Sequence, residues 1–482
     1  MDQVKKQPTF LLALVPIAIL IFLLTINVVV LGSDAISGAN QIALLLAAGV
    51  AGVISFRLGY SWEEIESSIV KSISSAMAAM LILLAIGSLS GTWLLSGIVP
   101  AMIYYGLKIL NPTIFLVAAC IVSGIVSLAT GSSWSTVATV GIALLGIGKS
   151  MDVPEGVIAG AILSGAYFGD KMSPLSDTTN LAPAMAGTDL FTHIKYMVYT
   201  TVPTLIITLV IFFIWGFTLD TAGATADSSS VLLALESKFN LNPILFIVPV
   251  LVIVMIVKKV PALPALLVGA LLGGIAAIIF QPQIITQISG IEGDYLKASF
   301  IAVMNAMTTS INIQTNDPMI TELLTAKGMS GMLNTIWLIL CAMIFGGVME
   351  SSGLLKAIAE QIIKFAHSTG SLVASTAATC IFFNFTASDQ YMAIAVPGRM
   401  YADTYRKRGL KPEVLSRTLE DSGTVTSVLI PWNTCGATQA NVLGVATMVY
   451  APYTFFCLIS PFMTILQAYL NIKIRRLNDP KE

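Results

Sequence analysis

The sequence predicts an all-α membrane protein that crosses the bilayer many times. Of its 482 residues, 56% are hydrophobic and only 11% are charged, and the mean hydropathy is +0.86. Ordinary soluble domains carry about 25% charged residues, so this chain has too few polar side chains to cover a globule in water. The net charge of −1 does not indicate a partner, and no basic block suggests nucleic acid.

The first apolar segment runs from Phe10 to Leu31 and follows Lys5 and Lys6. It is longer than the apolar region of a secretory signal, which has roughly 7–15 residues, and long enough to span about 30 Å of hydrocarbon. We expect a transmembrane helix that is retained. Further apolar segments lie at about 41–56, 76–95, 97–107, 113–129, 136–148, 155–168, 196–218, 242–257, 262–280, 296–313, 333–349, 353–366, 371–386, 390–400, 414–431 and 441–471. The last is long enough for two spans, with a break at Pro452.

Several of these segments are too short to cross a bilayer. The segment 136–148 follows Gly131-Ser132-Ser133, and the segment 155–168 ends in Gly169-Asp170-Lys171. Short apolar helices that are interrupted by polar residues are tolerated at membrane depth only where they are buried in protein or line a cavity. The pattern therefore predicts discontinuous or re-entrant helices.

Positive charges predict the orientation of the chain, because cytoplasmic loops are rich in lysine and arginine. The N-terminal lysines, Arg57 with Lys71, and the basic residues at 473–476 are placed on the cytoplasmic side together with one larger cluster. Both termini are therefore expected in the cytoplasm. The larger cluster consists of Arg399, Arg406, Lys407, Arg408, Lys411 and Arg417.

Two stretches of the chain resemble each other at an offset of 256 to 258 residues. Thr130, Pro154-Glu155 and Pro174 of the first stretch correspond to Thr386, Pro412-Glu413 and Pro431 of the second, and the order of polar breaks and apolar helices agrees. Transporters are commonly built from such repeats, and their substrate sites lie where broken helices of the two halves meet. We expect a single transporter domain over 1–482, with inverted repeats whose cores are 113–218 and 371–471.

The repeat frames four polar breaks, at 130–136, 169–180, 386–391 and 431–438. Their carbonyl, hydroxyl and carboxylate oxygens suit a hard cation, whereas helix N-termini would suit an anion. Ionisable side chains within a membrane are costly and are functional candidates by default. These candidates are Asp170 and Asp177 at the second break, Asp389 in the third, Asp421 in the helix that follows, and Glu350 at the end of 333–349.

The repeat alignment matches Asp389 with Ser133 and Asp177 with Thr434, so each half would contribute one carboxylate. Burial disfavours the charged form of a carboxyl group, and such a group can hold a proton or a sodium ion but not both. Competition of this kind is sufficient for antiport, and Asp177, Asp389 and Asp421 are the candidates for proton coupling.

Each candidate also has a structural explanation. Asp170 would form an interfacial pair with Lys171, and Asp177 and Asp389 would cap the helices that begin beside them. The remaining explanations are an Asp421 pair with Arg417, an interfacial position for Glu350, and a packing role for Ser132 and Ser133.

Three motifs resemble those of sodium/proton antiporters of the NhaC family. They are Thr130-Gly-Ser-Ser-Trp-Ser-Thr136, the sixteen residues from Gly165 to Asn180, and Leu429-Ile-Pro-Trp-Asn-Thr434. The resemblance implies a bacterial inner-membrane protein that exchanges Na⁺ for H⁺ and needs no cofactor beyond these transported ions. The family also includes exchangers of small carboxylates, such as malate against lactate.

Resemblance to the wider group of ion transporters implies that polar hairpin tips bind sodium, with Asp177 and Asp389 as Na⁺ ligands. The ion-binding candidates are Ser132, Ser133, Asp170, Ser176, Asp177, Thr178, Ser388, Asp389, Asn433 and Thr434.

Sodium/proton antiport is thus the leading hypothesis, and Na⁺- or H⁺-coupled exchange of a small carboxylate is the alternative. A carboxylate site favours a buried cation, but the near candidates, Lys171 and Arg399, both end apolar segments. An enzyme is not expected, because the chain has no HExxH motif and Ala143 replaces the first glycine of a phosphate loop before Gly148-Lys149-Ser150. Broken helices with internal carboxylates fit a coupled carrier better than a channel, and the sequence leaves a homodimer open.

Overall fold

The computed structural model describes residues 5–31, 38–109, 111–219, 221–315 and 318–477. These residues are α-helical almost throughout, and a two-residue antiparallel pairing of β1 (Ile311–Asn312) with β2 (Thr325–Ala326) is the sheet that they contain. Within the described residues, seven helices are long and apolar enough to cross a membrane, or up to nine if each of two bent pairs is one span. The prediction of an all-α polytopic membrane protein is confirmed.

The N-terminal half begins with α1 (Phe10–Leu31), which has the bounds of the predicted first span. The helix α3 begins well before the apolar segment predicted at 76–95, because Ser61 and Glu64 form a capping box at its polar end. The further elements are α2 (Ala39–Arg57), α3 (Trp62–Leu95), α4 (Ile98–Ile109), α5 (Pro112–Thr130), α6 (Ser133–Thr136), the π-helical η2 (Val137–Gly141), α7 (Ile142–Lys149), α8 (Glu155–Met172), α9 (Asp177–Ala186) and α10 (Leu190–Gly216).

The middle of the chain connects the two halves. Its elements are α11 (Thr221–Lys238), the 3₁₀ turn η3 (Pro243–Phe246), α12 (Ile247–Val257), α13 (Ala262–Phe280), α14 (Pro282–Ser289), α15 (Tyr295–Thr308), α16 (Pro318–Leu323) and the 3₁₀ turn η4 (Ser330–Met332). The predicted segment 296–313 is thus shorter as a helix, since α15 ends at Thr308.

The C-terminal half differs most from the predicted segments. The segment predicted at 414–431 is divided among a short helix, a π-helical turn and a 3₁₀ turn. The chain bends by 54° between Thr447–Tyr453 and Phe455–Tyr469, beside the break predicted at Pro452, and this pair counts as at most one span. Its elements are α17 (Leu333–Ser351), α18 (Leu354–Ile363), α19 (Thr369–Thr386), α20 (Gln390–Lys407), α21 (Pro412–Leu419), η5 (Glu420–Thr424), η6 (Ser427–Leu429), α22 (Thr434–Leu443), α23 (Thr447–Tyr450), η7 (Ala451–Tyr453) and α24 (Phe455–Tyr469).

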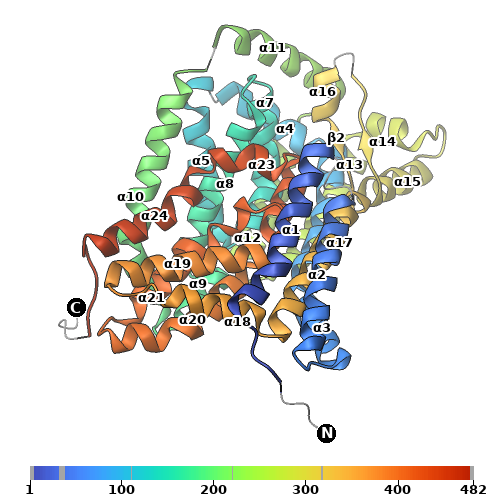
Figure 1. Ribbon diagram of the computed structural model, residues 1–482. Coiled ribbons are helices and arrows are strands. Elements are labelled where there is room, and N and C mark those ends of the chain that lie inside the picture. The colour runs from blue at the N-terminus through green and yellow to red at the C-terminus, as the bar shows by residue number, and fades with distance from the viewer. Residues whose placement is uncertain (1–4, 32–37, 110, 220, 316–317, 478–482) are drawn as a thin grey trace.

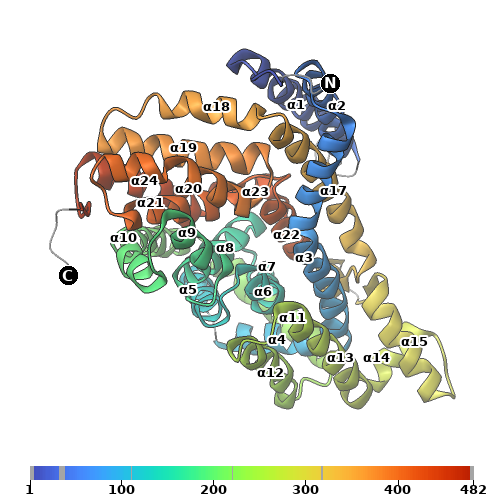
Figure 2. The same ribbon diagram turned by 90° about the horizontal axis from the view of Figure 1, so that it is seen from below.

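The helices form two groups that meet along α3 and α22 (Figures 1 and 2). One group contains α5, α8, α9 and α10 of the N-terminal half beside α19, α20, α21 and α24 of the C-terminal half. The other group is an arm in which α3 packs against both α13 and α17, while α2 packs against α17 and α1 against α18. The N-terminal pair α1–α2 therefore lies against the C-terminal half, so the halves are intertwined.

The order of elements repeats between the halves over a longer stretch than the sequence motifs indicated. A left-handed glycine follows α3 at Gly97 (φ 78°) and another follows α17 at Gly353 (φ 70°), each after a serine and 256 residues apart. In each half the next helix, α4 or α18, precedes a helix that ends at a polar break, α5 or α19. The inversion of one repeat relative to the other stays a prediction.

Candidate functional site

All four predicted polar breaks line one cavity of about 870 Å³. The walls also include the middle of α3 and the connection between α12 and α13, and the described lining contains the exposed Lys259 as well as three carboxylates. The residues that line it at the breaks are Thr130, Gly131, Ser132, Trp134, Asp170, Pro174, Leu175, Ser176, Asp177, Thr178, Asp389, Gln390, Tyr391 and Thr434. Chain segments some 250 residues apart thus contribute oxygen atoms to the same space.

Asp170 joins the first two breaks. Its Oδ2 atom accepts hydrogen bonds from the backbone N–H of Ser133 at 3.0 Å and from the Ser133 hydroxyl at 2.6 Å. The Ser176 hydroxyl lies beside the same carboxyl group, and only 8% of Asp170 is exposed. Hydrogen bonds to a carboxylate are among the stronger ones in proteins, so the end of α8 is held against the beginning of α6.

Asp389 lies at the third break, where its side chain caps α20 by accepting a hydrogen bond from the Met392 N–H at 3.0 Å. The preceding residue, Ser388, has a left-handed backbone (φ 57°), and its carbonyl oxygen accepts the N–H of Thr434 at 2.9 Å. This bond joins the third break to the fourth. Asp389 is 2% exposed and lines the cavity, so a capping role and an ion-binding role are compatible.

Each break ends in a capped helix. Ser132, Ser176, Asp389 and Asn433 are the N-caps of α6, α9, α20 and α22, and each accepts a backbone hydrogen bond within three residues. Asp177, which the sequence also suggested as a cap, is instead the first residue of α9. Its side chain is exposed and lines the cavity, so its carboxylate is available to an ion there.

The sequence-predicted site residues fall into two sets: those that line the cavity, and those that hold the lining residues in place. Ser132, Asp170, Ser176, Asp177, Thr178, Asp389 and Thr434 line the cavity. Ser133, Ser388 and Asn433 do not, and they hold lining residues in place instead. Asn433 illustrates this, because its side-chain amide donates to the carbonyl of Asn384 at 3.0 Å while its oxygen caps α22.

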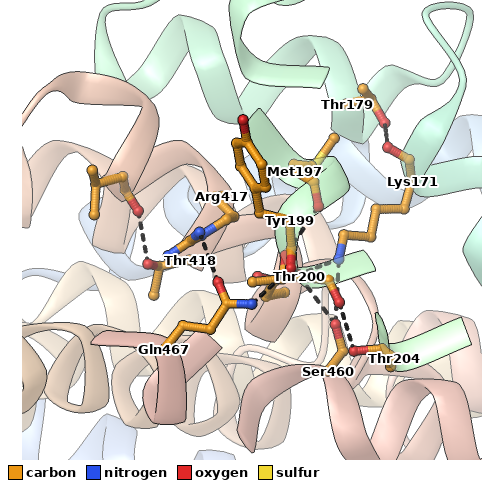
Figure 3. Close-up of polar contacts among 12 residues, drawn as sticks. Lys171, Thr179, Met197, Tyr199, Thr200, Thr204, Arg417, Thr418, Ser460 and Gln467 are labelled. Atoms are coloured by element: carbon orange, nitrogen blue, oxygen red, sulfur yellow. Dashed lines mark hydrogen bonds and ion pairs between the residues drawn. The ribbon is translucent and has the colours of Figure 1, made fainter. Parts of the chain in front are cut away.

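Asp421 and Glu350 lie away from the cavity. Glu350 is exposed at the end of α17. Asp421 is fully buried in η5 and forms an ion pair with Lys171, which is also fully buried. Ser460 donates to the same Asp421 oxygen at 3.1 Å and Thr200 at 3.4 Å. Figure 3 shows the Lys171 side chain reaching from α8 to Ser460 and Thr200.

These contacts correct three predictions. Lys171 is not an interfacial partner of Asp170, because the two side chains bind different partners. Asp421 pairs with Lys171 rather than with Arg417. Arg417 does not belong to a solvated cytoplasmic cluster: it is fully buried, its guanidinium lies 4.4 Å from the Tyr196 ring centroid, and it donates to Gln467 at 3.3 Å (Figure 3). The positive-inside rule counts basic residues along the chain and takes no account of burial by distant segments.

Sequence reasoning also missed Glu420 and His193, both fully buried. The signal that could have found Glu420 is spacing, since Glu413, Arg417 and Glu420 or Asp421 recur at intervals of three or four and so share one helix face.

A model of the Na⁺/H⁺ antiporter family matches residues 165–472. This chain belongs to the Na⁺/H⁺ antiporter family. The NhaC Na⁺/H⁺ antiporter of Alkalihalophilus pseudofirmus is 36% identical, over 90% of this chain and 91% of that protein. The match confirms the resemblance that the motifs carry, and the chain is a multi-pass membrane transporter.

Relatives with other printed substrates match nearly as well. The malate-2H⁺/Na⁺-lactate antiporter of Bacillus subtilis is 36% identical over 89% of both chains. The arginine/ornithine antiporter ArcD of Halobacterium salinarum is 33% identical over 99% of this chain and 95% of that protein. The family thus contains proteins named for different cargoes, and the site itself has to indicate the cargo of this chain.

Proposed function

We propose that this protein exchanges Na⁺ for H⁺ across the cytoplasmic membrane of a bacterium, with the sodium ion held at Asp170, Asp177 and Asp389. The observation that carries the proposal is that both repeats direct carboxylates into one cavity among hydroxyl groups. Carboxylate, hydroxyl and carbonyl oxygens are the ligands that hard cations prefer. The acidic lining favours a cation over an anion as the cargo.

The exchange would follow from Na⁺ and H⁺ replacing each other at the cavity carboxylates. A sodium ion and a proton both neutralise a buried carboxylate, and an empty pair of carboxylates in such surroundings is costly. The negative charge of these carboxylates is therefore neutralised by either Na⁺ or H⁺ for most of the cycle, so binding of one cargo favours release of the other. The helix breaks allow this, since short helices that end at a cavity can shift without breaking a full span.

Exchange of a small carboxylate is the second candidate, because a relative named for malate and lactate is as similar as one named for Na⁺ and H⁺. Lys171 and Arg417 are buried cations that such a cargo would favour. Neither lines the cavity, however, and Lys171 is neutralised by Asp421. This arrangement supports the cation exchanger.

The test uses purified protein in sealed liposomes with an internal pH dye. A sodium gradient is applied alone, and then with malate, lactate or arginine on either side. Proton movement driven by sodium alone is the expected result. If no proton movement occurs until an organic solute is added, the proposal is overturned, and the effective solute identifies the cargo. Liposomes without protein control for leakage.

A further inference from the structure

Glu420 is a fully buried carboxyl group that lies outside the cavity lining. It begins the π-helical turn η5, and neither of its oxygens makes a hydrogen bond of ordinary geometry with a described residue, the Thr424 hydroxyl of the same turn being the neighbouring donor. An ionised carboxylate in that position would lose its hydration without replacement, at a cost of several kcal/mol. A neutral carboxylic acid avoids most of this cost, so the geometry around Glu420 suits a bound proton. π-helical turns are also frequent at functional sites.

The charges around Glu420 come from both repeats. Asp170 and Lys171 are consecutive in α8, and Lys171 pairs with Asp421, which directly follows Glu420. The buried ion pair therefore joins the residue next to Glu420 to the residue next to the cavity carboxylate Asp170. The titratable or charged side chains on α8, α10 and the elements packed against η5 include Asp170, Lys171, Asp177, His193, Cys380, Tyr401, Tyr405, Glu413, Arg417, Asp421 and Cys457.

A row of ionisable groups leads from the N-terminal end of α21 to Glu420. Glu413 is the first member of this row and forms an ion pair at 3.4 Å with Arg475, whose side chain is 23% exposed. Arg417 follows one turn later, with two guanidinium nitrogens that lack a partner among the described residues, and Glu420 follows Arg417. None of the three lines the cavity, and Arg417 keeps its own proton, so a proton that reached Glu420 along this side of the protein would not pass the sodium ligands.

We propose that Glu420 is a proton-binding site separate from the sodium cavity, and that Asp170 couples the two. The inference rests on the proposed Na⁺/H⁺ exchange. A nearby negative charge favours the protonated form of a carboxyl group and a nearby positive charge disfavours it. Sodium at Asp170 neutralises a negative charge that favours the protonated form of Glu420. Sodium binding therefore favours release of the proton from Glu420 to solvent.

The decisive variant is Glu420→Gln, which keeps the size of the side chain and cannot exchange a proton. Two activities are compared in proteoliposomes: exchange of ²²Na⁺ against unlabelled Na⁺, which needs no proton, and Na⁺-driven proton movement. We expect Glu420→Gln to retain the first and to lose the second by about tenfold or more, the size of a typical coupling between sites. Glu350→Gln, an exposed carboxyl group on α17, is the matched control and should retain both.

Two outcomes would overturn the inference. If Glu420→Gln still moves protons, the cavity carboxylates carry them, and if it loses both activities, sodium handling depends on Glu420 and the two sites are not separate. Proton release by detergent-solubilised protein on addition of NaCl provides a second measurement, since Glu420→Gln should bind ²²Na⁺ without releasing a proton. A wild-type protein that moves no protons in a sodium gradient would instead refute the proposed function itself.

Discussion

Lys171 of α8 and Asp421 of η5 form a fully buried ion pair between the two repeats. The adjacent Asp170 lines the cavity and binds Ser133, so consecutive residues of α8 belong to the cavity wall and to the contact between the repeats. Any shift at the end of α8 must therefore change both. The ion pair therefore lies where movements of α8 during a transport cycle would strain or relax it.

Removal of one partner of this pair should destabilise the protein strongly. Asp421→Asn or Lys171→Met leaves the other charge buried and unpaired, which costs about 3–5 kcal/mol. The double variant Lys171→Met/Asp421→Leu should recover much of this loss, because it buries no charge. Thermal unfolding in detergent measures the three variants, and fully additive losses in the double variant would contradict the pairing.

Asp177→Asn should abolish Na⁺/H⁺ exchange and leave folding and membrane insertion intact. Asp177 is exposed to the cavity at the first position of α9, and Ser176 rather than Asp177 caps that helix. The substitution therefore removes a cavity charge without removing a structural bond. Asp152→Asn, at an exposed position outside the lining, is the control and should transport normally. A variant at Asp177 with ordinary transport would remove this residue from the mechanism.

Much of the site could be predicted from the sequence, because the local composition indicates where helices break. Gly131-Ser132-Ser133 and Ser388-Asp389 are polar residues between apolar segments, and the structure places both at helix ends beside one cavity. The offset between the repeats pointed to these positions without any knowledge of three-dimensional contacts.

The partners of buried charges could not be predicted in the same way. Lys171 and Asp421 are 250 residues apart, and no local pattern indicates that they meet. Arg417 was placed in a cytoplasmic cluster because the positive-inside rule counts basic residues along the chain, whereas its burial depends on Tyr196 of α10 and Gln467 of α24. Long-range packing decides such positions.

Ser133→Ala should weaken sodium binding without abolishing transport. The variant removes the 2.6 Å hydroxyl bond to Asp170 and keeps the backbone N–H bond to the same oxygen. A hydrogen bond to a charged group contributes about 1.5–3 kcal/mol, so the sodium concentration for half-maximal exchange should rise by about tenfold or more. Initial rates of proton movement over a sodium series measure this. An unchanged concentration would show that the hydroxyl does not position Asp170 for sodium.

Gly131→Ala should impair transport far more than Gly187→Ala. Both glycines have a left-handed backbone, with φ of 70° and 85°, so a Cβ atom strains each by a similar amount, about 1–2 kcal/mol. At Gly131 the Cβ atom would also lie 2.6 Å from the carbonyl carbon of Leu175, whereas nothing lies within 4 Å at Gly187.

The difference between the two variants therefore isolates the close approach of the first break to the second. Gly131→Ala must push the residues around Ser132 away from those around Ser176, which widens the cavity at the sodium ligands. We expect lower sodium affinity and slower exchange for Gly131→Ala, and near-normal exchange for Gly187→Ala, both measured at equal reconstituted amounts. Equal effects of the two substitutions would mean that backbone strain alone matters, and that contact between these breaks does not shape the site.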